Sequence, residues 1–406
     1  MAGDSSAESA DGAAALYALV PKEQAESTRR ALDAEGLLDT TRKAHVHSGQ
    51  LALPLAASAA SSSAPQLAWS GGVLPTALLV PPTKARGERA SLRDAVQRAL
   101  LAEAAPAEHA ALLLRDAALP KRWEKLGDVL LFAPRGMLDS STAAGAALHA
   151  LSPVQRAALW AALASALGAR RLGVQGVIEE SLHRKSTARL LWPEEGASGW
   201  TVQRENGVSY GIDVTRNMFS SGNVTEKARV GRFRCQGQTV VDLYAGIGYF
   251  TLPYLVCAGA EHVHACEWDE DALEALRRNL EANGVAGRCT VHPGDNAGSA
   301  SALRGVAHRV NLGLIPSSEQ GWPLAVGALR AEGGTLHVHA NVGSAAEAEA
   351  EWVSRLCSSL GELAARDGRA GWVAQLLHLE RVKSYAPKVN HVVADVRLGV
   401  GPSGRA

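Results

Sequence analysis

The residues that could do chemistry gather around one glycine-rich turn. An apolar run ends in Asp242, and Gly246 and Gly248 follow it closely. A second apolar run ends in Glu267, nineteen residues beyond Gly248. Glycines in such a turn let the backbone approach a ligand, and an acid at the end of the next strand can accept hydrogen bonds from a ribose diol. The order of strand, glycine turn, helix, strand and acid therefore predicts one half of a doubly wound sheet with a ribose-bearing ligand.

The turn is not the dinucleotide fingerprint G-x-G-x-x-G, because Tyr249 follows Gly248 and no third glycine comes after it. The pattern D-x-x-A-G-x-G with a later acid is typical of enzymes that use S-adenosyl-L-methionine, and an ordinary βα turn is the alternative. After the next predicted strand come Asp295 and Asn296, which can read an adenine amino group and ring nitrogen or can merely cap a helix. Trp268 could lie against the adenine or pack in the core.

A polar segment before the first strand could cover this pocket. If Phe219 packs beside the pocket, Ser220 and Lys227 would lie over it. A lysine there could bind the carboxylate of the co-substrate as a point charge. A solvated helix face is the alternative interpretation of the same residues.

The rest of the C-terminal region predicts the elements that must position these residues. Strands are expected to begin near Val240, Val263, Thr290, Arg309, Thr335, Ala374 and His391. They alternate with helices, one of which begins after Asp269 as N-cap and ends at Asn283. The last two strands are joined by residues 383–387, a polar connection that suggests an antiparallel pair. This is an α/β class of fold, a Rossmann-like class I methyltransferase fold with smaller N-terminal α+β domains.

Composition divides the chain into three expected domains. Residues 1–95 form a small αβ domain with a tail and a flexible loop or linker at 56–75, residues 96–210 an α+β middle domain, and residues 211–406 the catalytic domain.

Charge and cysteine usage set further bounds. Lys and Arg total 41 and Asp and Glu total 41, so the formal net charge is zero and a globally basic nucleic-acid binder is excluded. Five cysteines without a C-x-x-C pair predict reduced thiols. No secretion signal and no apolar stretch of membrane length is found, so we expect a cytoplasmic protein that does not bind membranes.

Local basic clusters around the predicted cleft nevertheless favour a polyanionic substrate. The clusters are Lys227, Arg229, Arg232 and Arg234; then His183, Arg184, Lys185 and Arg189; then Arg381, Lys383 and Lys388. Each could instead be a solvated face. Base stacking would depend on the few aromatic candidates, which are Phe219, Tyr249, Trp322 and Tyr385.

These motifs resemble a known family. The strings Asn217–Ser220, Asn223–Lys227, Asp242–Pro253, His264–Trp268 and Asn311–Glu319 are similar to those of the tRNA wybutosine-synthesizing aminocarboxypropyltransferases, which are relatives of the tRNA guanine-37 N1-methyltransferases. The resemblance covers about residues 180–400. The methyltransferases carry N-L-P where this chain has Gly313, and usually P-R where it has Ser221 and Gly222, so both departures point away from methyl transfer.

The resemblance implies the reaction. The 3-amino-3-carboxypropyl group of S-adenosyl-L-methionine would move to carbon 7 of 4-demethylwyosine in tRNA(Phe), and methylthioadenosine would leave. No metal and no stable protein partner are expected. Residues 1–95 would position the tRNA body. The expected cofactor-binding residues are Ser220, Lys227, Asp242, Gly246, Gly248, Glu267, Asp295 and Asn296.

No catalytic base is identified from the sequence. His337, His339 and Glu319 are candidates only because they lie near strand ends. The alternatives are a tRNA guanine-37 N1-methyltransferase and a catalytically inactive tRNA- or partner-binding subunit that retains the fold.

Overall fold

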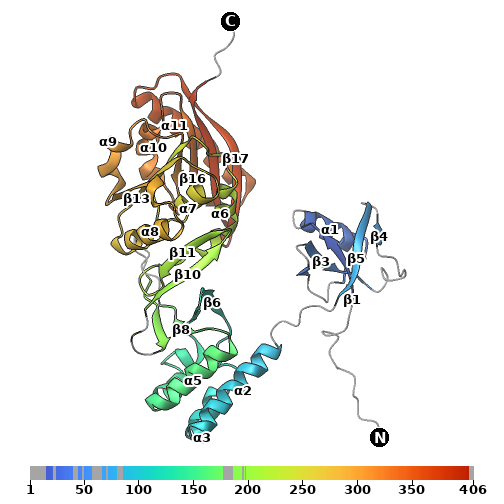
Figure 1. Cartoon of the computed structure of the whole chain (residues 1–406). Helices are drawn as coiled ribbons and strands as arrows, with labels where there is room; N and C mark the ends of the chain where they lie inside the picture. The colour runs from blue at the N-terminus through green and yellow to red at the C-terminus, as the bar shows by residue number, and fades with distance from the viewer. Residues whose placement is uncertain are drawn as a thin grey trace. The chain divides into compact units, whose positions relative to one another are not determined.

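A computed structural model of the chain describes residues 15–21, 24–39, 44–47, 50–56, 66–69, 72–79, 86–176, 186–193, 196 and 198–401. It divides into two compact units, Met1–Ala95 and Val96–Ala406 (Figure 1). The three domain boundaries expected from composition stay a prediction.

The described part of the first unit is built on an antiparallel sheet with strand order β2-β3-β1-β5-β4. Its elements are β1 (Ala15–Val20), α1 (Ala25–Ala34), β2 (His45–His47), β3 (Gln50–Pro54), β4 (Gln66–Trp69) and β5 (Gly72–Leu79). Leu32 of α1 packs against Val20 and Leu53 of the sheet.

The flexible linker predicted at residues 56–75 is wrong in its second half. Residues 66–69 pair with residues 72–75 as the hairpin of β4 and β5, and β5 continues the sheet by pairing with β1. The Ala- and Ser-rich composition before these strands is typical of a linker and gives no sign of them. Their backbone pairing depends on β1, a strand that is distant in the sequence.

The second unit begins with a four-stranded sheet in the order β6-β7-β8-β9. Helix α2 (Arg86–Ala102) spans the boundary between the two units. The elements that follow it are α3 (Ala107–Leu113), β6 (Trp123–Leu126), β7 (Val129–Phe132), α4 (Ala143–Ala150), α5 (Pro153–Ala166), β8 (Arg171–Val174) and β9 (Arg189–Trp192). Helix α5 begins with a capping box, in which the Ser152 and Gln155 side chains each bond the other's backbone N–H.

A hairpin of β10 (Trp200–Glu205) and β11 (Val208–Asp213) follows. Buried Asn279 of helix α8 (Glu270–Ala282) ties it to the glycine turn. The Asn279 amide bonds both backbone groups of Gly211, at 2.6 and 2.9 Å, and the carbonyl of Ile247 at 2.9 Å. The hairpin and the turn are thus held by one side chain.

The C-terminal region holds a seven-stranded sheet in the order β14-β13-β12-β15-β16-β18-β17. The strands are β12 (Thr239–Asp242), β13 (His262–Glu267), β14 (Cys289–Pro293), β15 (Arg309–Leu312), β16 (Gly334–Gly343), β17 (Trp372–Ala386) and β18 (Val389–Val400). Strands β14, β13, β12, β15 and β16 run parallel to one another. Strand β18 runs antiparallel to both of its neighbours, β16 and β17. All the predicted strands of this region are confirmed, and so is the closing antiparallel pair.

The polar connection predicted at residues 383–387 is wrong in extent. Strand β17 continues to Ala386, and only Pro387 and Lys388 separate it from β18. Lys388 has φ 60°, a left-handed conformation that allows such a tight reversal. The polar side chains of residues 383–386 suggested a loop, but their backbone continues to pair with β18.

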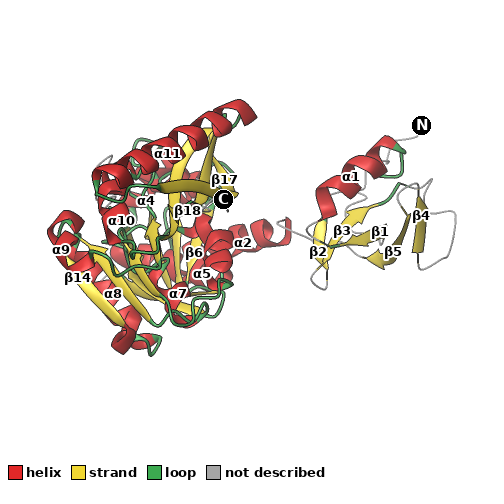
Figure 2. Cartoon of the chain, turned by 90° about the horizontal axis from the view of Figure 1, so that it is seen from above, coloured by secondary structure: helices red, strands yellow, loops and turns green. Residues whose placement is uncertain are grey.

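Alternate residues of the central strands face two separate cores. Val240 and Val263 pack with α7 (Thr251–Val256) and α8, whereas Val241 and Cys266 pack with α10 (Trp322–Ala328) and α11 (Ala346–Arg366). This two-sided burial is typical of parallel sheets. Figure 2 shows the helices on the two faces of the strands. In the described part of the chain, no helix is both long and apolar enough to cross a membrane.

Candidate active site

A cavity of about 440 Å³ opens at the carboxyl edge of the parallel strands. Its wall includes residues 243, 244, 246 and 247 after β12, 266–269 at the end of β13, 294–297 after β14 and 313–315 after β15. The segment 217–223 before helix α6 (Val224–Gly231) supplies the remaining side through Asn217, Met218, Ser220 and Asn223. Ligands of doubly wound sheets bind at this edge.

The glycine turn has the backbone that the motif requires. Gly246 has φ 56° and Gly248 has φ 98°, so both adopt conformations that other residues rarely take. Gly246 lines the cavity. Gly248 does not; a Cβ at this position would lie 3.0–3.1 Å from Leu252 and Leu276, so its absence permits close packing of α7 and α8 behind the turn.

Asp242 lies behind the turn and outside the cavity wall. Its fully buried carboxylate accepts hydrogen bonds from Thr251 Oγ1 at 2.8 Å and Asn311 Nδ2 at 3.0 Å. Burial raises the pKa of the Asp242 carboxyl, and these two donors oppose the shift. Asp242 therefore ties the end of β12 to α7 and β15, and it supports the turn from behind.

Glu267 lies in the cavity wall at the end of β13. Its Oε2 accepts the Gly246 N–H at 2.7 Å, and its Oε1 accepts the Trp268 and Asp269 N–H groups at 2.9 Å each. Burial raises the pKa of Glu267, and the backbone donors oppose that shift. A carboxylate offers about four acceptor positions, so one remains for a ligand hydroxyl.

Asp295 and Asn296 also line the cavity. The Asp295 carboxylate caps η7 (Asn296–Ser299) by accepting the Ala297 N–H at 2.8 Å, and Asn296 Nδ2 donates to the Leu243 carbonyl at 3.1 Å. Asp295 thus caps a helix, which was the alternative interpretation, and it also lines the cavity. Trp268 lines the same region and is 44% exposed, so it does not pack in the core.

Ser220 reaches the cavity on a segment that Tyr249 holds in place. The Tyr249 hydroxyl accepts the Ser220 N–H at 3.1 Å and donates to the Met218 carbonyl at 2.8 Å. The Ser220 hydroxyl accepts a hydrogen bond from Asn223 Nδ2 at 2.9 Å. Phe219 packs inward and is 6% exposed, which meets the condition on which the placement of Ser220 depended.

Lys227 does not line this cavity. Its ammonium is 1% exposed, forms an ion pair with Glu205 of β10, and donates to the Ser220 carbonyl at 3.3 Å. The rings of Tyr210, Phe219 and Tyr249 surround it at 5.0, 4.9 and 5.5 Å. Burial lowers the pKa of Lys227, and Glu205 opposes the shift. The lysine thus touches the backbone of the pocket segment from behind, which is not the solvated helix face considered above.

Sequence reasoning missed Glu205 and the Tyr249 hydroxyl. Glu205 precedes Lys227 by 22 residues in a different element, so no local spacing connects the two. A glutamate at the end of an amphipathic strand is ordinarily exposed, and only the packing of α6 on the hairpin buries it.

The end of β15 presents no polar side chain to the cavity in the places where a methyl acceptor would be held. Gly313, Leu314 and Ile315 line it. Asn311 points back and donates to Asp242, so it does not replace the missing group.

The three candidate bases also lie outside the wall. His337 and His339 are each 1% exposed within the sheet, where His337 bonds Asp395 at 2.6 Å and His339 bonds His391 at 3.1 Å. Glu319 lies 3.7 Å from Arg355 on the surface. The structure therefore supports none of them as a group that touches substrate.

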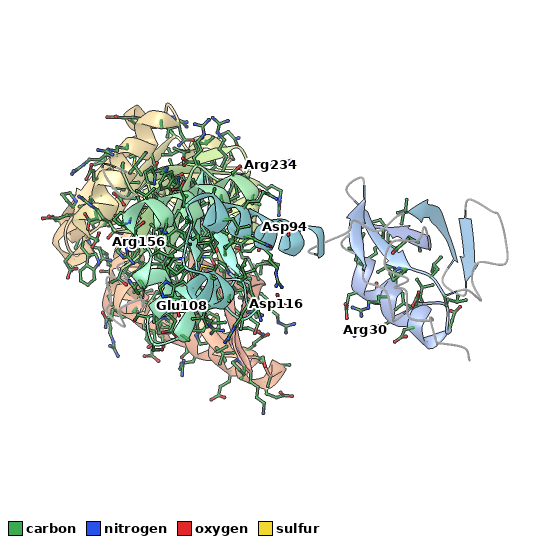
Figure 3. All side chains as sticks on the ribbon, turned by 90° about the horizontal axis from the view of Figure 1, so that it is seen from below. Arg30, Asp94, Glu108, Asp116, Arg156 and Arg234 are labelled. Atoms are coloured by element: carbon green, nitrogen blue, oxygen red, sulfur yellow. The ribbon has the colours of Figure 1, made fainter. Side chains whose placement is uncertain are left out.

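The first predicted basic cluster is divided by the fold. Lys227 and Arg229 point inward, contrary to a surface role, because Arg229 pairs with Glu226 at 2.7 Å and Asp395 at 2.6 Å. Arg232 and Arg234 remain exposed, and Figure 3 labels Arg234. The residues His183, Arg184 and Lys185 lie outside the described part of the chain.

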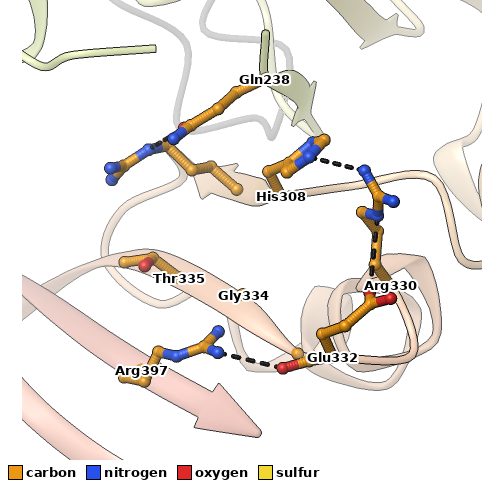
Figure 4. Close-up of a pocket in the computed structure, with 9 residues that line it drawn as sticks. Gln238, His308, Arg330, Glu332, Gly334, Thr335 and Arg397 are labelled. Atoms are coloured by element: carbon orange, nitrogen blue, oxygen red, sulfur yellow. Dashed lines mark hydrogen bonds and ion pairs between the residues drawn. The ribbon is translucent and has the colours of Figure 1, made fainter. Parts of the chain in front are cut away.

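A second cavity of about 410 Å³ lies at the opposite, amino edge of the parallel strands (Figure 4). Its arginines contact neighbouring groups of the protein. Arg309 donates to Gln238 at 2.7 Å, and Arg397 donates to the Glu332 carbonyl at 3.0 Å. The edge at which ligands bind in this architecture carries the first cavity, so that cavity is the candidate active site. Among the residues that the structure describes, no group of three or more metal-ligating side chains is found.

Comparisons with known proteins agree with this geometry. Residues 201–360 match the TRM5/TYW2 methyltransferase domain, and residues 19–63 match the tRNA methyltransferase 5 N-terminal domain. The chain is 38% identical to the tRNA wybutosine-synthesizing protein 2 homolog of Danio rerio over 93% of this chain and 97% of the relative.

Two further similarities extend the comparison. The chain is 46% identical, over 69% of its length, to the tRNA wybutosine-synthesizing protein 2/3/4 of Arabidopsis thaliana, of which it spans 26%. The crystal structure of P. horikoshii TYW2 in complex with MeSAdo is 26% identical with a TM-score of 0.56, over 76% of this chain and all of that one. The chain thus spans about a quarter of the plant relative and nearly all of the fish relative.

Proposed function

The chain belongs to the tRNA wybutosine-synthesizing protein 2 family, and from this premise we propose that it is an S-adenosyl-L-methionine-dependent aminocarboxypropyltransferase. It moves the 3-amino-3-carboxypropyl group to carbon 7 of 4-demethylwyosine at position 37 of tRNA(Phe). Methylthioadenosine is the second product. The observation that carries the proposal is a cavity with the glycine turn and Glu267 on one side and no polar acceptor at Gly313.

The cavity residues fit S-adenosyl-L-methionine. Glu267 retains acceptor capacity for a ribose hydroxyl after bonding three backbone N–H groups. Asp295 and Asn296 supply polar groups for adenine next to the flat side chain of Trp268. The complex with MeSAdo in the P. horikoshii relative supports a site for methylthioadenosine here as well.

The methionine end belongs on the side of Ser220. Gly246 lines the cavity with its backbone, and the Ser220 segment faces it from the other wall. Lys227 acts on that segment through the Ser220 carbonyl. Asp242 and Gly248 serve the site from behind, by holding the turn and by allowing close packing.

The reaction requires one carbon of the sulfonium to face the base. When bound, S-adenosyl-L-methionine supplies three electrophilic carbons on sulfur, so geometry decides which of them reacts. A bond forms between carbon 7 of the base and the γ-carbon, the bond from that carbon to sulfur breaks with its electron pair going to sulfur, and carbon 7 then releases its proton. The protein's contribution is to hold the methionine end so that the γ-carbon lies in line.

Methyl transfer to guanine N1 is the alternative within the family. A methyltransferase of this kind needs a polar group at the end of β15 to hold the acceptor nitrogen, and Gly313 and Leu314 provide none. Asn311 is committed to Asp242 at 3.0 Å. These contacts favour transfer of the larger group.

We also propose that the enzyme works in the cytoplasm. The five cysteines are free thiols, which fits a reducing compartment. Microscopy of a fluorescently tagged full-length chain would test this placement, and a signal confined to another organelle would contradict it.

Mass spectrometry of the products tests the function. The full-length protein is incubated with S-adenosyl-L-methionine and tRNA(Phe) carrying 4-demethylwyosine, and we expect methylthioadenosine together with an aminocarboxypropyl mass gain on the base. S-adenosylhomocysteine with a methyl gain would establish the methyltransferase instead. Cofactor binding without either product would reject this acceptor or assign the chain a binding role.

A further inference from the structure

The fold leaves one of the four aromatic candidates for base stacking on the surface. Phe219 and Trp322 are each 6% exposed, and Tyr249 lines the cavity wall with its hydroxyl bonded to both Ser220 and Met218. Tyr385 is 48% exposed. It lies next to the turn between β17 and β18, far along the chain from the glycine turn.

The strand register places this turn at the same edge of the sheet as the active-site cavity. Strand β16 runs parallel to β15, so its last residue, Gly343, lies at the carboxyl edge. Gly343 pairs with Val389, the first residue after the turn, and the Ser344 N–H donates to the Lys388 carbonyl at 2.9 Å. Strand β17 is three strands from β15, which corresponds to about 14 Å.

An irregularity in β17 turns Tyr385 away from the regular pleat. Ser384 pairs with Asn390 and Ala386 with Val389, so Tyr385 is an extra residue with no partner position on β18. Bulges of this kind re-aim side chains at sheet edges and next to active sites. The backbone that carries the exposed ring is therefore held by strand pairing on both sides of Tyr385.

Two lysines flank the ring. Lys388 occupies the exposed turn. Lys383 reaches across to η5 (Ser221–Asn223) so closely that a Cβ on Gly222 would collide with its Nζ. Since Asn223 and Ser220 line the cavity, Lys383 links the turn directly to the wall of the active site.

The β17–β18 hairpin is also anchored to helix α11 on the side that leads to Tyr385. Arg381 of β17 donates three hydrogen bonds, at 2.6–3.0 Å, to the Glu349 carboxylate of α11, and Asn390 donates to the same group at 3.4 Å. Arg381 was expected in the basic cluster around the cleft, but this pairing neutralises it. The contact between Arg381 and Glu349 connects the hairpin to helix α11 and so limits the movement of the hairpin tip relative to the sheet.

We propose that this hairpin tip, Lys383, Tyr385 and Lys388, is the docking surface for single-stranded RNA next to the target base, with Tyr385 stacking on a neighbouring nucleobase. The inference rests on the proposed function. Sequence-specific RNA binding uses splayed bases stacked on aromatic side chains, and lysines neutralise the phosphates beside them. A base stacked on Tyr385 fixes the strand relative to the cavity, so the tip helps to choose which nucleotide enters.

Binding of full-length protein to tRNA(Phe), followed by fluorescence anisotropy, tests the proposal without depending on turnover. We expect Tyr385→Ala to weaken RNA binding roughly 5- to 100-fold, the range that corresponds to loss of one stacked base. Tyr385→Phe keeps the ring and should bind within about twofold of the wild type. Affinity for S-adenosyl-L-methionine, measured by calorimetry, should stay unchanged in both variants.

Leu377→Ala is the matched control. Leu377 is also an extra residue in β17 and is 55% exposed, but it lies toward the other end of the strand, so RNA binding should not change. Lys388→Asn removes a charge with a residue that tolerates the left-handed backbone, and it should lower the slope of log affinity against log salt by about 0.7.

The outcomes separate this inference from the proposed function. Unchanged RNA affinity in Tyr385→Ala, equal losses in Tyr385→Ala and Tyr385→Phe, or a parallel loss of S-adenosyl-L-methionine binding would each overturn the stacking role. Failure of the wild type to release methylthioadenosine would reject the proposed function while leaving the anisotropy result to be judged on its own.

Discussion

Replacing Lys227 with alanine is expected to lower both the stability of the fold and the affinity for the methionine end of the co-substrate. The Lys227 and Glu205 side chains are 1% and 9% exposed. Removing one partner of a buried ion pair leaves an uncompensated charge, which costs about 3–5 kcal/mol. With a urea dependence of about 3 kcal/mol per molar for a unit of this size, the unfolding midpoint should fall by about 1–2 M.

A double substitution separates stability from binding. Lys227→Met with Glu205→Leu removes both charges, and replacing a buried pair by apolar side chains is often close to neutral. Its urea midpoint, followed by circular dichroism, should therefore return to within about 0.5 M of the wild type. The Ser220 carbonyl still loses the donor at 3.3 Å, so the segment over the cavity is less firmly held.

Ligand binding to the double variant then reports on the role of Lys227. We expect affinity for S-adenosyl-L-methionine to fall by about tenfold, the effect of losing one hydrogen bond to a charged group. Affinity for methylthioadenosine, which lacks the aminocarboxypropyl group, should stay within about twofold, and methylthioadenosine release in turnover should slow. Equal losses for the two ligands, or no loss for either, would refute the assignment of Lys227 to the methionine end. A decrease of less than about 1 kcal/mol in the free energy of unfolding of Lys227→Ala would refute the argument that this variant leaves Glu205 as a buried, uncompensated charge.

Three further perturbations test other parts of the structure. Glu267→Gln should weaken S-adenosyl-L-methionine binding by about 10- to 100-fold in calorimetry, because charge-assisted hydrogen bonds are worth about 1.5–3 kcal/mol; unchanged affinity would exclude a ribose contact. Burial, with His262 and His292 nearby, lowers the pKa of His264 to about 4, so the unfolded chain binds its proton first and stability falls as the pH drops from about 6.5 toward 4. Since the ring is half-buried, urea unfolding at pH 7.5 and 5 should show His264→Gln to be less acid-sensitive by only about 1 kcal/mol, and an equal pH dependence in both proteins would contradict this origin. Removal of residues 1–85, which leaves α2 whole, should weaken tRNA binding more than S-adenosyl-L-methionine binding, and the reverse result would reject the tRNA-positioning role of the N-terminal unit.

The sequence by itself determined the catalytic sheet and the centre of its site. Strands β12 and β13 are short apolar runs that end in Asp242 and Glu267, and Asp295 follows β14 by two residues. Glu267, Asp295 and the glycine turn could therefore be predicted from signals within a few residues. Parallel strands place their carboxyl ends at one edge, and that rule brings these three signals together without any knowledge of the packing. The cap at Asp269 was predictable for the same local reason.

Only the tertiary structure decided which polar side chains face inward. Helix α6 carries Lys227 and Arg229 on the side that packs against β10 and β18, where Glu205 and Asp395 neutralise them. No spacing in the sequence connects partners 22 and 166 residues apart, and a basic run on a short helix reads equally well as a surface. The exposure of Tyr385 likewise depends on the register of two strands, because pairing is set by contacts across the sheet and not by the residues next to the ring.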